Sequence, residues 1–202
     1  MKGTIESQTN YLSLAISIVD SYTKEQPVGT LTFYLNNENL QPIKNNSGYY
    51  LFLNLHEDNY TLWVHSEFYF DTSFDVQLSS LNPLNPLIEI ELKPTPSYPF
   101  PSGATLIRGT VLDSTKRTIP NAIVEIREKD IKSLTSQKGE YALYFPPLKK
   151  DEVVKENGKR YVKTANGKKI CITASLGKQT GKVTLDGVEE GASNSVKYIL
   201  LR

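Results

Sequence analysis

The side chains that commonly perform catalysis are scarce and scattered in this sequence of 202 residues. Its two histidines, His56 and His65, could bind zinc together with Glu57 or Asp58, since zinc sites use imidazole and carboxylate ligands. However, residues 56–59 have the composition of a hairpin turn, and His65 lies on the face of an expected strand. We therefore interpret both histidines as structural or solvated, and predict no metal site.

The remaining reactive groups also favour no catalytic or cofactor site. The single cysteine, Cys171, lies between two isoleucines on an expected strand, and we expect a buried thiol that only fills space. Glu89 and Glu91 alternate with isoleucines, which is typical of the wet face of a strand rather than of an acid–base pair. The sequence has no glycine-rich phosphate loop. We expect a protein that is not an enzyme and binds no cofactor.

Aromatic side chains are the stronger candidates for binding. The sequence holds 12 tyrosines, 7 phenylalanines and 1 tryptophan. In the first half, several of them alternate with regularly spaced leucines, and exposed rings on such a face can stack on sugars or anchor a protein interface. The alternative is that the aromatic face is the interior and the leucine face is outside. The four candidates are Trp63, Tyr50, Phe52 and Tyr34.

The formal net charge of +1 conceals an asymmetry between the two halves. Residues 1–103 contain 4 lysines and 11 acidic residues, a net charge of 4 − 11 = −7. Residues 104–202 contain 19 basic and 11 acidic residues, a net charge of 19 − 11 = +8. This arrangement favours head-to-tail attraction between copies, or two partners of opposite sign. The alternative is that the two halves simply differ in composition.

Much of the basic charge lies in one segment, residues 149–169, with 8 basic and 3 acidic residues. The pairs Asn157-Gly158 and Asn166-Gly167 both predict type I′ turns, so we expect an exposed basic hairpin. Its role would be to dock onto an acidic protein surface; with Tyr161 as its one aromatic residue, we do not expect it to bind nucleic acid. The candidate contacts are Lys155, Lys159, Arg160 and Lys163.

The elements that must position these residues are β-strands, because apolar residues recur at every second position between Asn, Asp, Gly and Pro. No segment has helical periodicity. Four prolines between Lys93 and Gly103 remove backbone donors and fix φ, which predicts a stiff spacer. The sequence thus predicts an all-β fold, with two tandem antiparallel Greek-key β-sandwich domains at 1–93 and 104–202, joined by a proline-rich linker at 94–103.

The two halves repeat the same signals in the same order. A strand ends at Asp20 in the first half and at Asp113 in the second, and each Asp is expected to start a turn by bonding to the backbone. A proline then precedes the next strand. Gly48 and Gly139 follow, each expected to take a positive φ before an aromatic-rich strand. We infer that both halves share one fold.

The second half carries motifs of a known family. The segments are Arg108–Asp113, Ile119–Ile126, and Thr135 followed by Gly139–Leu143. They resemble the carboxypeptidase regulatory-like family, whose transthyretin-like (prealbumin-like) β-sandwiches have a strand ending in Asp, a Pro before Gly-Ala-x-Val, and then Thr, Gly and an aromatic-x-Leu strand. Asn121 stands where the family usually has Gly, and the first half matches less closely. The resemblance implies a non-catalytic accessory module, often attached to enzymes, receptors or surface assemblies.

These observations together predict a structural or binding protein that contacts other proteins, or copies of itself, within a larger assembly. The alternative is a carbohydrate-binding module that uses the aromatic residues around Trp63. The sequence has no apolar run long enough to span a membrane, and the stretch 11–19 is interrupted by serines, unlike a signal peptide. We therefore expect cytoplasmic synthesis. From the habit of the resembled family, we expect an accessory part of a phage-tail-like or contractile injection particle.

Overall fold

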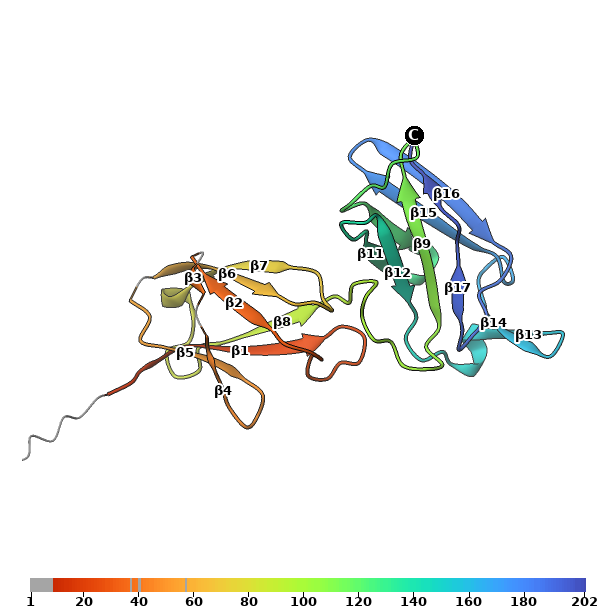
Figure 1. Cartoon of the computed structure of the whole chain (residues 1–202). Helices are drawn as coiled ribbons and strands as arrows, with labels where there is room; N and C mark the ends of the chain where they lie inside the picture. Colours follow the sequence, from red (N-terminus) through yellow and green to blue (C-terminus); the bar gives the residue numbers. More distant parts are fainter. Residues whose placement is uncertain (1–8, 37, 40, 57) are drawn as a thin grey trace, which may run out of the picture. The chain divides into compact units, whose positions relative to one another are not determined.

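The computed structural model describes residues 9–36, 38–39, 41–56 and 58–202. This part of the chain is built from β-strands with three 3-10 turns, at Leu78–Ser80, Arg127–Lys129 and Lys150–Glu152, and it contains no α-helix. No helix in these ranges is long and apolar enough to cross a membrane. The chain divides into two compact units, Met1–Lys93 and Pro94–Arg202 (Figure 1).

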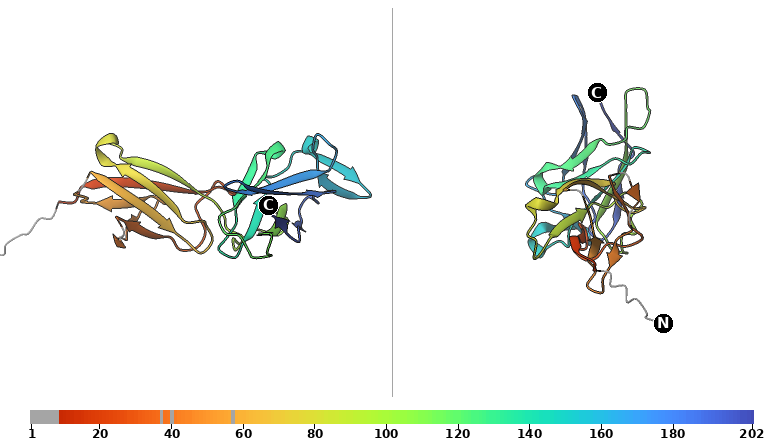
Figure 2. Two further views of the ribbon diagram at one scale, coloured as in Figure 1. Left: turned by 90° about the horizontal axis from the view of Figure 1, so that it is seen from above. Right: turned by 90° about the vertical axis from the view of Figure 1, so that its left-hand side faces the viewer.

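The first unit is a pair of four-stranded sheets packed face to face (Figures 1 and 2). One sheet has the order β4-β5-β1-β8, with bounds Ile43–Lys44, Tyr50–Leu53, Leu12–Asp20 and Leu87–Leu92. The other has the order β3-β2-β6-β7, with bounds Glu38–Asn39, Thr32–Leu35, Asn59–His65 and Thr72–Gln77. The core between them holds Leu14, Ile16, Ile18, Phe33, Leu35, Leu62, Val64, Ile90 and Leu92.

The second unit repeats this plan and adds a hairpin. One sheet has the order β12-β9-β17, with β18 also pairing β9, and bounds Glu140–Tyr144, Leu106–Leu112, Ser193–Ser195 and Ile199–Leu200. The other has the order β11-β10-β15-β16, with bounds Ile131–Leu134, Ile123–Ile126, Ile170–Leu176 and Gln179–Leu185. The hairpin consists of β13 (Val153–Glu156) and β14 (Lys159–Val162).

In each unit the first strand (β1 or β9) lies between the last strand of the unit and the strand that follows the repeated glycine (β5 after Gly48, β12 after Gly139). The first and last strands pair in parallel: β1 with β8, and β9 with β17 and β18. The expectation of purely antiparallel sheets is therefore wrong at this one position in each unit. Alternation alone does not reveal it, because parallel and antiparallel neighbours share the same period of two.

The aspartates at the ends of the first strands act as the sequence predicts. Asp20 Oδ1 accepts a hydrogen bond from the backbone N–H of Tyr22 at 2.7 Å. Asp113 Oδ1 accepts from the backbone N–H groups of Thr115 at 2.7 Å and Arg117 at 2.9 Å. The bond from Arg117 is the largest cause that lowers the pKa of Asp113 below its ordinary value. Each carboxylate thus fixes the loop that leads to the next strand.

The glycines of the repeat also have the expected conformation. Gly48 has φ +88° and Gly139 has φ +72°. A Cβ at Gly139 would lie 2.7 Å from Cβ of Thr118 and 3.1 Å from the carbonyl oxygen of Val111. Only glycine fits there, because both the backbone angle and the space exclude a side chain.

Residues 94–103 belong to the second unit rather than standing free of it. Arg108 Nη1 on β9 donates a hydrogen bond to the carbonyl of Pro96 at 2.6 Å. The same guanidinium lies over the ring of Phe100, which also packs on Tyr144 with ring centroids 5.7 Å apart. The segment folds through turns closed by the hydrogen bonds from Tyr98 N–H to the Thr95 carbonyl and from Ala104 N–H to the Pro101 carbonyl, and Phe100 attaches it to β9 and β12.

Candidate functional site

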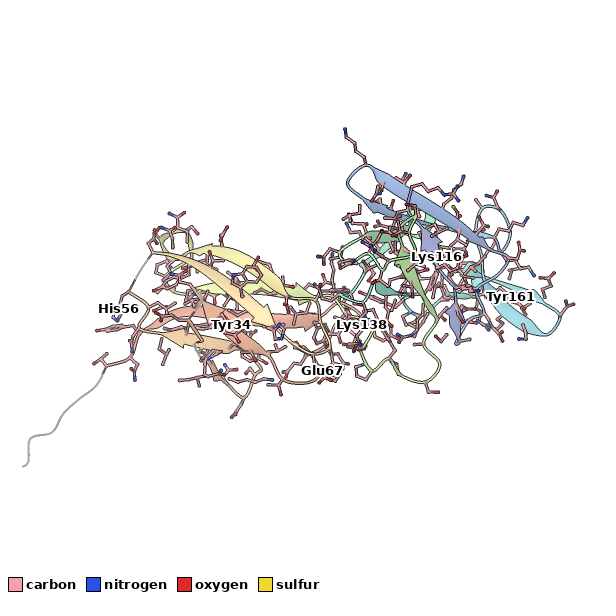
Figure 3. The ribbon with its side chains drawn as sticks, turned by 45° about the horizontal axis from the view of Figure 1, so that its top comes forward. Tyr34, His56, Glu67, Lys116, Lys138 and Tyr161 are labelled. Atoms are coloured by element: carbon pink, nitrogen blue, oxygen red, sulfur yellow. The ribbon has the colours of Figure 1, made fainter. Side chains whose placement is uncertain are left out.

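Trp63 and Tyr34 form a cross-strand pair on the outer face of the β3-β2-β6-β7 sheet. They lie directly opposite each other in the antiparallel β2–β6 ladder. Leu62 and Val64 on either side of Trp63 are fully buried, so the indole points outward and is 42% exposed. Tyr34, labelled in Figure 3, is half-buried beside it. The structure therefore brings these two candidates together on one exposed surface.

Phe52 and Tyr50 lie on the other sheet and face inward, so the prediction that they form an exposed aromatic face with Trp63 is wrong. Phe52 is only 4% exposed and packs edge-on against Phe33, with ring centroids 5.9 Å apart. Tyr50 is half-buried and lies 4.8 Å from the same ring. Phe52 pairs with the buried Leu14 of β1, and directly opposed residues share a face.

The pairing of β5 with β1 sets these orientations. Leu14 and Ile16 of β1 face the core opposite Phe52 and Tyr50, whereas Leu51 lies opposite Ala15 on the outer face. Leu12 pairs with Leu53, so β1 contains one extra residue between Leu12 and Leu14, and this bulge turns Leu12 outward. Leu51 and Leu53, which the sequence places inside, therefore point outward. The alternative stated above, an aromatic interior and a leucine exterior, is therefore correct for β5 but not for β6.

Because Leu51 and Leu53 of β5 face outward, an apolar row that the sequence analysis did not predict runs across the outer face of the β4-β5-β1-β8 sheet. In the ladder, Ile43 of β4 lies beside Leu51 of β5, Leu51 beside Ala15 of β1, and Ala15 beside Leu87 of β8. A second pair, Leu12 and Leu53, extends the row. Ile43 is 56% exposed, Leu12 is 45% exposed and Leu87 is also exposed, whereas Leu51 and Leu53 are half-buried and Ala15 is buried. We call these six residues the apolar row.

The apolar row differs from an ordinary scattering of surface leucines, because its members are neighbours across all four strands of one sheet. A hollow of about 460 Å³ lies at its β4–β5 end; Ile43, Leu51 and Leu53 line it together with Leu35 and Tyr60 of the other sheet. The signal in the sequence was the unbroken apolar run from Tyr49 to Leu53. A strand that is apolar on both faces is expected to be covered on both.

A second hollow, of about 310 Å³, lies around the aromatic pair, lined by Tyr34, Trp63, Val64, His65 and Asp71. His65 Nδ1 and Asp71 Oδ1 are 2.5 Å apart, and both side chains are more than half exposed. Next to it, Thr61 Oγ1 donates to Asp75 Oδ1 at 2.9 Å. Of the other zinc candidates, Asp58 accepts a hydrogen bond from the backbone N–H of Ser79, and Glu57 lies outside the described residues. Among the described residues no group of three metal-ligating side chains occurs.

The predicted basic hairpin is present as β13 and β14 (Figure 3, near Tyr161), and two of its cations, Lys159 and Arg160, form ion pairs within the second unit. Lys159 Nζ lies 2.7 Å from Glu189 Oε2, and Arg160 binds Glu190 through both Nε and Nη2. Lys155 and Lys163 are exposed. These ion pairs reduce the net positive charge that the hairpin offers to another molecule. They join residues about thirty positions apart, which no local pattern reveals.

Two further expectations in the second unit need correction. Asn157 and Gly158 have φ of 49° and 77°, as a type I′ turn requires, but of Asn166 and Gly167 only Gly167 has a positive φ, so this second reversal is not type I′. Cys171 is exposed rather than buried. Its neighbours Ile170 and Ile172 are both fully buried, and a residue between two inward side chains must point outward.

Comparison with known proteins gives the following similarities. No protein family and no curated protein matches the sequence. Among solved structures, the chain is similar to the Bacillus anthracis TIE protein, with 13% identity and a TM-score of 0.32, over 94% of this chain and 34% of that one. It is similar to the shaft pilin SpaA of Lactobacillus rhamnosus GG, with 8% identity and a TM-score of 0.28, over 96% and 98% of the two chains. It is also similar to a streptococcal ancillary pilin, with 12% identity and a TM-score of 0.28, over 94% and 62%.

Proposed function

We propose that this chain is a non-enzymatic structural or binding protein that works by protein–protein contact within a larger assembly. The observation that carries the proposal is the apolar row on the outer face of the β4-β5-β1-β8 sheet. Burying apolar surface is the main source of affinity between proteins, and a contiguous exposed patch of it marks an interaction surface. The partners are other proteins or further copies of this chain.

The charges of the two units support the same function in a different way. The first unit has a net charge of −7 and the second +8, since residues 94–103 carry no charge. Opposite charges steer association and select orientation more than they add affinity. Lys159 and Arg160 contribute little to this steering because they are paired with Glu189 and Glu190. Lys155 and Lys163 are therefore the residues through which the hairpin would contact an acidic partner. The apolar row would supply the binding energy and the charges the direction.

Two more specific proposals concern the family of the chain and the type of assembly in which it works. Two of the residues that carry the resemblance to the carboxypeptidase regulatory-like family, Asp113 and Gly139, form the turns that their residue types predict, which supports this proposal. On that resemblance we propose a transthyretin-like accessory module made in the cytoplasm for a phage-tail-like or contractile injection particle. The neighbouring genes would test this: tail or sheath genes support it, and their absence contradicts it.

Sedimentation velocity tests the interaction surface directly. The double variant Ile43→Asp/Leu87→Asp places two charges in the apolar row, and Leu176→Asp, at an exposed leucine of the second unit, is the matched control. Association through the row should survive or strengthen in sulfate salts and disappear in the double variant only. Association through charge should instead weaken as salt rises. A chain that stays monomeric at every concentration and salt contradicts contact between copies.

A further inference from the structure

The hollow around Trp63 combines an aromatic platform with polar groups at its edge. Trp63 and Tyr34 are cross-strand partners, so their side chains leave the same face of the sheet from neighbouring strands. The strands are about 4.8 Å apart, and the pair therefore offers a platform about as wide as one six-membered sugar ring. The hollow lies on the opposite sheet from the apolar row, and any binding here is independent of the function proposed above.

Polar side chains border the platform instead of further apolar ones. Asp71 Oδ1 and His65 Nδ1 bind each other, so Asp71 Oδ2 and His65 Nε2 are the atoms of this pair that remain to bind a ligand. Ser73 of β7 lies directly opposite Trp63 in the next ladder and is exposed. A carboxylate accepts strong hydrogen bonds from hydroxyl groups, and an imidazole can donate or accept. The hollow thus has an apolar floor and hydrogen-bonding walls.

This combination selects against other classes of ligand. A wholly apolar ligand would cover the His65–Asp71 pair without giving it hydrogen bonds, which is costly. An anionic ligand would meet Asp71 and Asp75 in a unit whose net charge is −7. A neutral sugar avoids both penalties, because its C–H face is apolar and its hydroxyls lie around the rim. The volume of about 310 Å³ suits a single small ring.

We propose that this hollow is a binding site for a neutral pyranose sugar, which stacks on Trp63 and Tyr34 and donates hydroxyl hydrogen bonds to Asp71. Trp63 supplies the exposed face, and the hydrogen bond between His65 Nδ1 and Asp71 Oδ1 fixes the carboxylate in place. The site is shallow and open, so we expect dissociation constants on the order of 1 mM for one sugar unit. Tighter binding would require a longer oligosaccharide that continues along the sheet.

Trp63 is the only tryptophan of the chain, so its fluorescence reports this site alone. The full chain is titrated with glucose, galactose, mannose, N-acetylglucosamine and their short oligosaccharides, and with glucuronic and sialic acids as charged controls. We expect a saturable change in emission with at least one neutral sugar and none with the acids. Asp71→Asn should weaken that binding about tenfold, since one charge-assisted bond is lost. Ile43→Asp/Leu87→Asp should leave it unchanged.

A calorimetric titration of Trp63→Ala completes the test, with Tyr198→Ala, an exposed tyrosine of the second unit, as the matched control. Binding should disappear in the first and persist in the second, with circular dichroism showing that both are folded. The proposal is overturned if no neutral sugar of the panel gives a saturable change. It is equally overturned if Asp71→Asn binds as tightly as the wild type, because stacking alone would then explain the signal.

Discussion

Two buried tyrosines, one in each unit, should respond in opposite directions to the same substitution. Tyr69 is 2% exposed and Tyr141 is 1% exposed. The Tyr69 hydroxyl donates to Asp20 Oδ2 at 2.8 Å and accepts from the backbone N–H of Val28 at 3.0 Å. The Tyr141 hydroxyl is buried without a hydrogen-bond partner among the described residues. Replacing either residue by phenylalanine removes one oxygen and little volume.

The expected magnitudes follow from these contacts. Tyr69→Phe leaves the buried carboxylate of Asp20 one hydrogen bond short, and a bond to a charged group contributes about 2–3 kcal/mol. Tyr141→Phe instead removes a buried hydroxyl that has lost its water, which should raise the free energy of unfolding by about 1 kcal/mol. For units of about 100 residues, each kcal/mol corresponds to roughly 5 °C in Tm.

Trp63 fluorescence follows unfolding of the first unit, because that unit holds the only tryptophan, and far-ultraviolet circular dichroism follows both units. Tyr69→Phe should lower the fluorescence-detected Tm by about 10 °C or more, whereas Tyr141→Phe should leave it unchanged and raise the second unit's transition. A loss of stability of 1 kcal/mol or more in Tyr141→Phe would refute the reasoning, since it would mean that the hydroxyl has a partner.

Three further predictions concern titration and close packing in the second unit. Burial raises the pKa of Tyr141 above its ordinary value, so above about pH 10 the unfolded chain ionises this group while the folded chain does not; wild-type stability should fall above that pH, and less so in Tyr141→Phe, when both are melted across alkaline buffers. The pKa of Asp113 is lower in the folded protein than its unfolded value of about 3.9, so its carboxylate stabilises the fold above that pH, and this stability is lost as pH falls through the folded pKa. Asp113→Asn should make the stability less dependent on pH in acid, and an unchanged dependence would contradict this role of Asp113. A Cβ at Gly181 would lie 2.1 Å from the Leu200 carbonyl oxygen, so Gly181→Ala should displace the C-terminal strand and cost about 1–3 kcal/mol in denaturant unfolding, while Thr184→Ala on the same strand should cost little.

The sequence predicted the features of the fold that depend on residues close together in the chain. The turns at Asp20 and Asp113, the positive φ of Gly48 and Gly139, and the burial of Phe33 between outward side chains all follow from neighbours within a few residues. The all-β class followed from the same alternation, and the structure confirms it.

Features set by distant pairing were not predictable. Phe52 faces the core and Leu51 faces outward because of the residues they meet on β1, and the bulge between Leu12 and Leu14 turns Leu12 outward, although no residue near Phe52 signals this. The partners of Lys159 and Arg160 lie on a loop far along the chain. Cys171 is a different case, since the two flanking isoleucines already implied that its side chain points outward.

The measurement that tests the central claim most directly is site-specific photocrosslinking. A photoreactive amino acid is placed at Ile43 or Leu87 in the apolar row, or at Leu176 as the control, in the protein's own cells. Contact through the row predicts a discrete crosslinked product from Ile43 and Leu87 but not from Leu176. Excess wild-type chain should compete it away, and Ile43→Asp/Leu87→Asp should not. Equal products from all three positions, or none from the row, would contradict a protein-binding role for this sheet.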